Sequence, residues 1–185
     1  MITTVAFGQY LDTQNSETEK AYWEVVQTKS APFFSAVLEL GALFGGSPME
    51  VAHKIGNIGC LYGEMIQIHD DLNDCMIEPA GPDWVKGRGS LPILFTQTVD
   101  HPERLRFIEL RKNISALEAL REAQSILIRS GSISYSFHQL LSRYEAAQTI
   151  LTSIDLADPQ PLKKVLYDLI SPVQKFLNID YEPPI

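Results

Sequence analysis

The protein has 185 residues, of which 45% are hydrophobic and 21% are charged, and its 15 Lys+Arg against 23 Asp+Glu give a net charge of −8. This acidic balance, without a long run of lysine or arginine, excludes nucleic acid as an expected partner, because a phosphate backbone requires a basic face. An anionic ligand must therefore be reached through a local basic cluster or through bound cations.

The first helix signal is Ser16-Glu17-Thr18-Glu19, which has the form of a capping box. In that motif a hydroxyl and a carboxylate satisfy the first free amides of a helix. The apolar spacing that follows predicts a helix running toward Gly41, with a kink at Pro32 because proline removes one intrahelical hydrogen bond. Gly45-Gly46 is expected to end it.

A second, longer helix is predicted after this turn. Ser47-Pro48-Met49-Glu50 combines a capping box with proline at the first helical position, and the helix is expected to continue to about Cys75. Gly56, Gly59 and Gly63 lie inside it. Each lowers helix propensity by about 1 kcal/mol relative to alanine, so we expect them to allow close approach of another helix.

Residues 76–89 are expected to form a loop, because this stretch is rich in proline and glycine. Ser90 is expected to cap a short helix through Thr98, and no long alternating strand pattern occurs anywhere in the chain. Later helices are expected from Pro102, over 115–129 after a capping box at Ser115-Ala116-Leu117-Glu118, over 132–154 and over 161–177. The predicted fold class is all-α, a single domain over residues 1–185 with about six or seven helices.

Two features bear on where the protein acts. Cys60 and Cys75 are the only cysteines, too few for a disulfide framework, which favours a reducing, cytoplasmic compartment. The first residues lack the pattern of a secretory leader, and the most apolar stretch, 32–46, contains Ser35 and Glu39 and is too short to span a bilayer. No transmembrane segment is expected.

The segment with the clearest chemistry is acidic and lies at the end of the long helix. Asp70, Asp71 and Asp74 are three and four residues apart, so their carboxylates can converge on one side, with Gln67 one turn earlier. Convergence is repulsive, and a helix C-terminus adds negative charge. A cation would offset both effects, and hard oxygen ligands suit Mg²⁺. The alternative is a solvated acidic helix end without a ligand.

These residues resemble a known motif. Gln67 followed by Asp70-Asp71-Leu72-Asn73-Asp74 is similar to the second Asp-rich motif, Q-x-x-D-D-x-x-D, of the trans-prenyl diphosphate synthases. Four other segments resemble family motifs and occur in the family's order. Gly8-Gln9-Tyr10-Leu11-Asp12 is similar to G-Q-x-x-D, Lys29-Ser30 is similar to Lys-Thr, and 41–46 is similar to the family's small-residue helix end. Residues 83–92 are similar to D-x-x-x-G-K-x-T-L-P, with Arg88 in place of Lys and Ser90 in place of Thr. The resemblance covers about residues 8–92.

The resemblance implies a partial helical bundle of the isoprenoid synthase type. It implies that Asp70, Asp71 and Asp74 bind Mg²⁺ and that Lys29 and Gln67 act in catalysis on an allylic isoprenoid diphosphate. The residues expected to bind this substrate are Lys29, Gln67, Lys86, Arg88, Gln9 and Asp12. Each also has an ordinary structural interpretation, as a surface lysine, a helix-cap residue or a solvated loop charge.

One part of the family pattern is missing from the sequence. The family has a first D-D-x-x-D motif on an earlier helix, and the chain has no second pair of adjacent aspartates. We therefore expect the protein to act in head-to-tail chain elongation only with another chain or an N-terminal half. A homo- or hetero-oligomer is expected. The alternatives are a terpene cyclase-like or diphosphate-hydrolysing enzyme that uses the single motif, or a non-catalytic subunit of a prenyl synthase.

A rival from another class is a helical His-Asp phosphohydrolase, suggested by His69-Asp70 with His53 upstream. Such a site needs imidazoles and carboxylates that converge on one metal ion. The two histidines are sixteen residues apart on one predicted helix, about 24 Å at 1.5 Å per residue. They cannot share an ion, which disfavours this rival.

Overall fold

The computed structural model describes residues 2–15 and 17–177, with side chains described for 3–15 and 17–171. Regular structure in these residues is entirely helical, which confirms the all-α prediction. The helices are α1 (Ile2–Thr13), α2 (Glu19–Lys29), α3 (Ala31–Phe44), α4 (Met49–Met76), α5 (Pro82–Val85), α6 (Leu91–Thr98), α7 (Arg104–Arg111), α8 (Leu117–Arg129), α9 (Ser132–Thr152) and α10 (Gln160–Leu177).

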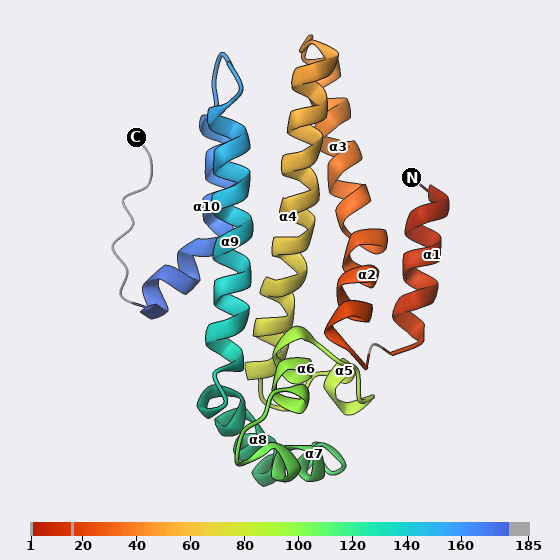
Figure 1. The fold of residues 1–185 in the computed structure, drawn as a ribbon, viewed down its shortest axis with the longest axis vertical. Helices are drawn as coiled ribbons and strands as arrows, with labels where there is room; N and C mark the ends of the chain where they lie inside the picture. Colours follow the sequence, from red (N-terminus) through yellow and green to blue (C-terminus); the bar gives the residue numbers. More distant parts are fainter. Residues whose placement is uncertain (1, 16, 178–185) are drawn as a thin grey trace.

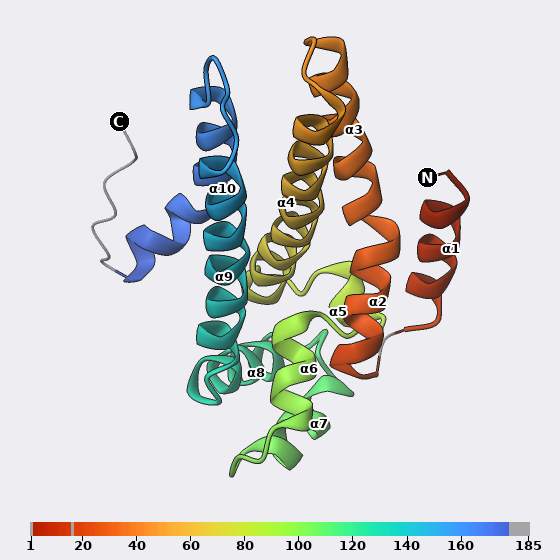
Figure 2. The same ribbon diagram turned by 45° about the horizontal axis from the view of Figure 1, so that its top comes forward.

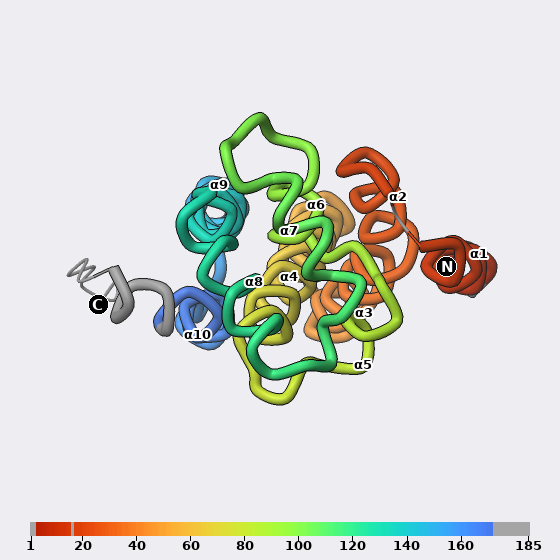
Figure 3. The backbone as a smooth tube through the Cα atoms, turned by 90° about the horizontal axis from the view of Figure 1, so that it is seen from below, coloured from red at the N-terminus to blue at the C-terminus, as the bar shows by residue number. Residues whose placement is uncertain are grey.

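The long helix α4 lies at the centre of the molecule (Figure 1). It packs against α3 on one side and against α9 on the other, with α10 beside α9 and α1 beside α2 (Figure 2). Seen from below, the short helices α5 to α8 gather around the C-terminal end of α4 (Figure 3). None of the helices that the structure describes is both long enough and apolar enough to cross a bilayer.

The first predicted helix is divided in two. The expectation of one helix kinked at Pro32 is wrong, because α2 ends before Ser30 and α3 begins directly after it. Pro32 lies in the first turn of α3, where its missing N–H has no intrahelical partner to lose. The N-cap of α2 is Thr18, whose hydroxyl accepts a hydrogen bond from the Ala21 amide at 3.2 Å; the expected cap, Ser16, lies outside the described residues.

Three further caps differ from the prediction. α4 and α8 start without a side-chain cap, so the capping boxes at 47–50 and 115–118 are wrong. Ser47 instead completes the end of α3, because its amide donates to the Ala42 carbonyl at 3.0 Å. Ser90 precedes α6 as expected, but its hydroxyl does not cap that helix. The described residues form ten helices, more than the six or seven predicted, partly because α7 starts separately at Arg104 and the short α5 lies inside the predicted loop.

The glycines of α4 allow α3 to approach closely, as predicted. A Cβ atom on Gly59 would lie 2.5 Å from the Phe34 carbonyl oxygen and 2.8 Å from the Ser35 Cα atom. A Cβ atom on Gly63 would lie 2.9 Å from the Ala31 Cα atom. These neighbours are backbone atoms, so they cannot move aside independently of the helix.

Gly59→Ala is therefore expected to lower the free energy of unfolding by about 2 kcal/mol, the usual cost of overpacking a core. Gly41→Ala on the exposed side of α3 is the matched control, because nothing lies within 4 Å of its added methyl group. There the gain in helix propensity is expected to stabilise by up to about 1 kcal/mol. Denaturant unfolding of both variants measures the difference, and equal effects would contradict the close approach.

A polar network fixes α2 against α4 and α9. The Arg143 guanidinium lies over the Trp23 ring, 4.1 Å from its centroid, and its Nε donates to Glu64 at 2.9 Å. Trp23 Nε1 donates to Glu19 at 3.0 Å, and the Tyr135 hydroxyl donates to the same carboxylate. This network holds the helix that ends at Lys29.

Candidate functional site

The acidic end of α4 is divided between buried and exposed side chains. Asp71 is only 7% exposed. Its Oδ1 accepts from Gln67 Nε2 at 3.1 Å, and its Oδ2 accepts from the Leu91 amide at 2.8 Å. The side chain of Asp70, by contrast, is 64% exposed, and Asp74 is also exposed.

Burial and mutual repulsion raise the pKa values of two of these aspartates. Burial raises the pKa of Asp71 to about 6, although the hydrogen bonds from Leu91 and Gln67 act in the opposite direction. The pKa of Asp74 is also raised, first by burial and then by the charges of Asp70 and Asp83. Both carboxyl groups are therefore harder to ionise than a solvent-exposed aspartate.

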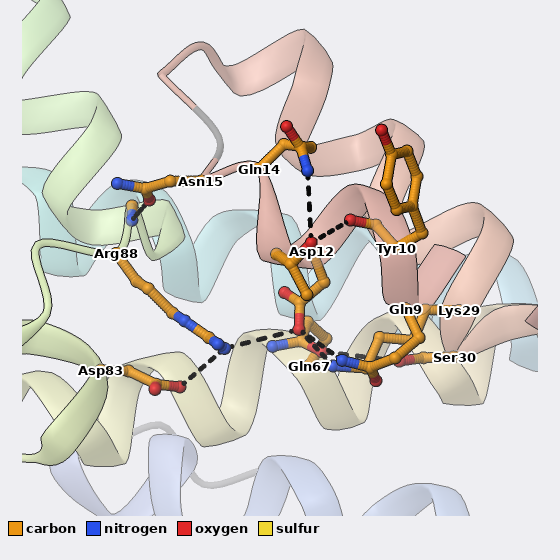
Figure 4. Close-up of polar contacts among 12 residues, drawn as sticks. Gln9, Tyr10, Asp12, Gln14, Asn15, Lys29, Ser30, Gln67, Asp83 and Arg88 are labelled. Atoms are coloured by element: carbon orange, nitrogen blue, oxygen red, sulfur yellow. Dashed lines mark hydrogen bonds and ion pairs between the residues drawn. The ribbon is translucent and has the colours of Figure 1, made fainter. Parts of the chain in front are cut away.

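Two cations, Lys29 and Arg88, meet the single carboxylate of Asp12 close to Gln67 of α4 (Figure 4). The Nζ of Lys29, the last residue of α2, lies 2.8 Å from Asp12 Oδ2. Arg88 Nη1 lies 3.4 Å from the same oxygen and 3.5 Å from Asp83 Oδ2. Gln9 Nε2 donates to Asp12 Oδ2 at 3.4 Å. Asp12 thus joins α1, α2 and the loop before α6.

Gly8 explains how Asp12 reaches Lys29. A Cβ atom on Gly8 would lie 2.5 Å from the Lys29 backbone nitrogen and 2.6 Å from the Thr28 carbonyl carbon. Only a residue without a side chain lets α1 lie this close to the end of α2. The glycine and aspartate of the 8–12 segment therefore act together, one permitting the approach and the other making the ion pair.

The loop that contains Arg88 is held from two sides. Asn15 Nδ2 donates to the Gly87 carbonyl at 3.0 Å, and its Oδ1 accepts from the Gly89 amide at 3.2 Å. Arg111 Nη2 donates to the Arg88 carbonyl at 3.2 Å. Gly87 has a φ of +76°, which favours glycine in this turn. These contacts direct the Arg88 guanidinium toward Asp12.

Most of the predicted site residues surround one pocket of about 110 Å³. Asp12, Lys29, Gln67, Asp71, Asp74 and Arg88 line it together. Gln9 touches the pocket only through Asp12, whereas Asp70 and Lys86 are exposed residues outside its lining. Lining residues that the sequence reasoning missed include Asn15 and Tyr22, for which no motif gave a signal.

Comparison with known proteins identifies the family of the chain that carries this pocket. Residues 1–127 match the sequence profile of the polyprenyl synthetase family. The chain belongs to the polyprenyl synthetase family. The match includes α1 to α7 and most of α8, and with them all the predicted site residues. The resemblance to trans-prenyl diphosphate synthases is thereby confirmed.

The relatives and solved structures that the chain resembles are longer than the chain itself. Geranylgeranyl diphosphate synthase of Methanosarcina mazei is 27% identical over 178 residues, which cover 90% of this chain and 52% of that protein. Heptaprenyl diphosphate synthase component 2 of Geobacillus stearothermophilus is 30% identical over 82 residues, 41% of this chain and 26% of its own length. The chain spans about half the length of the first of these relatives.

The fold comparison agrees with the family. A decaprenyl diphosphate synthase from Rhodobacter capsulatus superposes with a TM-score of 0.80 at 21% identity, over 92% of this chain and 57% of that structure. A geranylgeranyl pyrophosphate synthase from Bacteroides thetaiotaomicron gives 0.78 at 20% identity, over 91% and 60%. The predicted bundle of the isoprenoid synthase type is confirmed.

Members of the polyprenyl synthetase family generally use Mg²⁺. The carboxylate oxygens at the end of α4 fit a Mg²⁺ ion that is bound together with a phosphate group. Within residues 3–15 and 17–171, no three His, Cys, Asp or Glu side chains are arranged as a ready metal site. However, Mg²⁺ typically takes one or two carboxylates and completes its shell with water and substrate phosphates. Asp70 and Asp74 are exposed, lie one helical turn apart and repel each other. A cation between them would relieve that repulsion.

The histidines named for the rival class have other partners. His53 Nδ1 lies 2.6 Å from Glu39 Oε1, in a contact between α4 and α3. His69 Nδ1 lies 3.1 Å from Asn73 Nδ2 on the same helix. The histidines are on one helix, as expected, and the family assignment replaces the phosphohydrolase interpretation.

Proposed function

We propose that this polyprenyl synthetase binds the diphosphate group of an allylic isoprenoid with Mg²⁺ and acts as a prenyltransferase in head-to-tail chain elongation. The observation that supports it is the pocket, whose lining brings two cations, Lys29 and Arg88, together with acidic residues from the end of α4. Such a reaction begins when the allylic C–O bond breaks and its electron pair leaves with the diphosphate. Fixed positive charges beside the departing oxygens favour that step.

The charge balance of the pocket supports the need for a metal ion. Lys29 and Arg88 are accompanied by carboxylates on Asp12, Asp71, Asp74 and Asp83 in the lining. A bare diphosphate would meet an excess of negative charge there. When bound, Mg²⁺ would supply the positive charge that this pocket lacks. Asp70 and Asp74 would hold the ion, and a ligand role for Asp71 remains a prediction of the family resemblance.

The residues of the chain itself would orient the diphosphate. Lys29 and Arg88 both donate toward Asp12, so their charged groups are held at the pocket before a ligand arrives. Gln67 connects the end of α2 to Asp71. Its Oε1 lies 3.5 Å from the Ser30 hydroxyl, and its Nε2 donates to Asp71 Oδ1 at 3.1 Å. We propose that Lys29 and Arg88 bind diphosphate oxygens, and that Gln67 and Lys29 face the reacting carbon. Gln9 would hold Asp12, and Lys86 would reach the ligand only from outside the pocket.

We also propose that the active form contains helices supplied from outside residues 1–185, by a second copy, by another chain or by an N-terminal half. α3 exposes an apolar row at helical spacing, Phe33, Val37, Leu40 and Phe44, which are 49%, 49%, 51% and 90% exposed. Contiguous exposed apolar residues usually mark a protein interface. The designation of one relative as component 2 of a synthase is consistent with assembly from more than one chain.

Leu40→Glu tests this apolar row. The substitution is expected to reduce self-association or association with a complementary chain at least tenfold, because a charge would be buried at the interface. Leu105→Glu on α7 is the matched control, since Leu105 is 80% exposed and α7 lies at the opposite end of the molecule from most of α3 (Figure 1). Sedimentation equilibrium measures both. An unchanged dissociation constant for Leu40→Glu would exclude α3 from the interface.

Product analysis tests the proposed reaction. The protein is incubated with Mg²⁺ and farnesyl diphosphate, with and without isopentenyl diphosphate, and compared with Asp74→Asn. An elongated diphosphate that depends on Asp74 would support the synthase proposal. An alcohol or hydrocarbon without elongation would favour the cyclase-like or hydrolytic alternative. If no product forms, calorimetry with Mg²⁺ and inorganic pyrophosphate distinguishes a binding-competent subunit from a chain without this site.

A further inference from the structure

The start of α6 lacks the cap that its sequence suggests. Ser90 occupies the N-cap position, but its hydroxyl lies 3.1 Å from the Cys75 Sγ and makes no capping hydrogen bond. The first amide of the helix, on Leu91, donates instead to Asp71 Oδ2 at 2.8 Å. A carboxylate twenty residues earlier in the chain therefore satisfies an amide that would otherwise be left unpaired. Its negative charge also lies at the positive end of the α6 dipole.

We propose that Asp71 is a positioning residue that anchors the start of α6, and with it Arg88, rather than a ligand of Mg²⁺. This proposal rests on the proposed function only where it takes Arg88 to bind the diphosphate ligand. The anchoring itself rests on the hydrogen bond between Asp71 and Leu91 and on the burial of Asp71.

The surroundings of Asp71 disfavour direct metal binding. Its two oxygens are engaged by Gln67 and by the Leu91 amide, and the side chain is 7% exposed. Turning the carboxylate outward to join Asp70 and Asp74 would leave the buried Leu91 amide without its partner. Leaving a buried donor unsatisfied is costly. The motif thus contains two exposed carboxylates and one internal one.

The anchor acts on the pocket through a short piece of backbone. Arg88 lies three residues before Leu91, and its carbonyl accepts from Arg111 at 3.2 Å. The intervening Gly89 amide donates to Asn15 at 3.2 Å. These contacts and the Asp71 bond fix both ends of residues 88–91. The Arg88 guanidinium is consequently held 3.4 Å from Asp12 at the pocket.

Amide hydrogen exchange at Leu91 tests the anchor directly. Asp71→Ala is expected to raise the exchange rate of this amide at least tenfold, while amides in the core of α4 stay protected. Asp71→Asn is expected to raise it less than threefold, because the carboxamide oxygen can still accept from Leu91. Its NH₂ group can donate to Gln67 once the Gln67 amide rotates. Asp74→Ala is the matched control and should leave Leu91 unchanged.

Binding of Mg²⁺ in the presence of inorganic pyrophosphate separates positioning from ligation. Asp71→Asn is expected to weaken the apparent Mg²⁺ affinity less than threefold, and Asp74→Asn at least tenfold. The proposal is overturned if Asp71→Asn weakens Mg²⁺ as much as Asp74→Asn, or if Asp71→Ala folds and leaves Leu91 exchange unchanged.

These two readouts keep the proposals distinguishable. If Asp71→Ala does not fold, the Asp71→Asn comparison alone decides between an anchor and a ligand. If the unmodified chain binds no Mg²⁺ and pyrophosphate, the proposed function fails, while exchange at Leu91 still tests the anchor.

Discussion

Lys29→Ala is expected to lower the affinity for pyrophosphate in the presence of Mg²⁺ by about 30-fold, the equivalent of about 2 kcal/mol for a hydrogen bond to a charged group. The Lys29 side chain is 31% exposed and points into the pocket beside Asp12, so its charge is only partly screened by water. Removing it also leaves Asp12 with Arg88 as its remaining cation. Isothermal titration calorimetry measures the change.

Lys20→Ala is the matched control for Lys29. Lys20 is an exposed lysine on the same helix, nine residues earlier, and its loss removes the same net charge at a residue that does not line the pocket. We expect it to change the affinity less than twofold at 0.15 M salt, where distant surface charges are largely screened. Similar losses for both variants would mean that overall charge, and not the placement of Lys29, governs binding.

Arg143→Ala is expected to lower the free energy of unfolding by about 4 kcal/mol, typical for breaking a buried ion pair. Glu64 is only 13% exposed and would lose its 2.9 Å partner. Trp23 would also lose the guanidinium that lies over its ring. Because Trp23 belongs to α2, the helix that ends at Lys29 would be less firmly held, and ligand affinity should fall as well.

Arg129→Ala gives the comparison for Arg143. Arg129 makes an ion pair with Glu103 at 2.6 Å, but both side chains are much more exposed, at 53% and 38%. Exposed pairs contribute about 0–1 kcal/mol, so this variant should unfold almost like the original protein. Denaturant unfolding at pH 7 measures both variants. A loss below about 1 kcal/mol for Arg143→Ala would show that burial does not strengthen its pair.

Local sequence rules predicted the C-terminal ends of α3 and α4 closely, although the side-chain caps expected at the starts of α4 and α8 do not form. Gly45-Gly46 ends α3 as expected, with Gly46 in the left-handed region at φ +86°. α4 extends to Met76, one residue beyond the predicted end. The break at Ser30 was not predicted, because proline is compatible both with a kink and with the first turn of a new helix.

The site was predictable as a set of residues but not as a set of contacts. Spacing along α4 predicted that Asp70, Asp71 and Asp74 converge on one side of the helix, whereas Asp71 is buried and the other two are exposed. It could not show that a distant amide, that of Leu91, would draw Asp71 into the interior. The ion pairs of Asp12 with Lys29 and Arg88 likewise join residues 17 and 76 positions apart, beyond the range of any helical pattern.

The double ion pair at Asp12 gives the pocket a threshold for the charge of its ligand. Lys29 and Arg88 already interact with one carboxylate oxygen of Asp12. The binding energy of an incoming anion is therefore only the difference between its interaction with the two cations and the interaction that Asp12 already makes. A ligand with a single negative charge would offer little more than Asp12 does. A diphosphate presents several charged oxygens and can engage both cations while Asp12 stays nearby. We therefore expect the aspartate that pairs with both cations to favour highly charged groups over simple carboxylates.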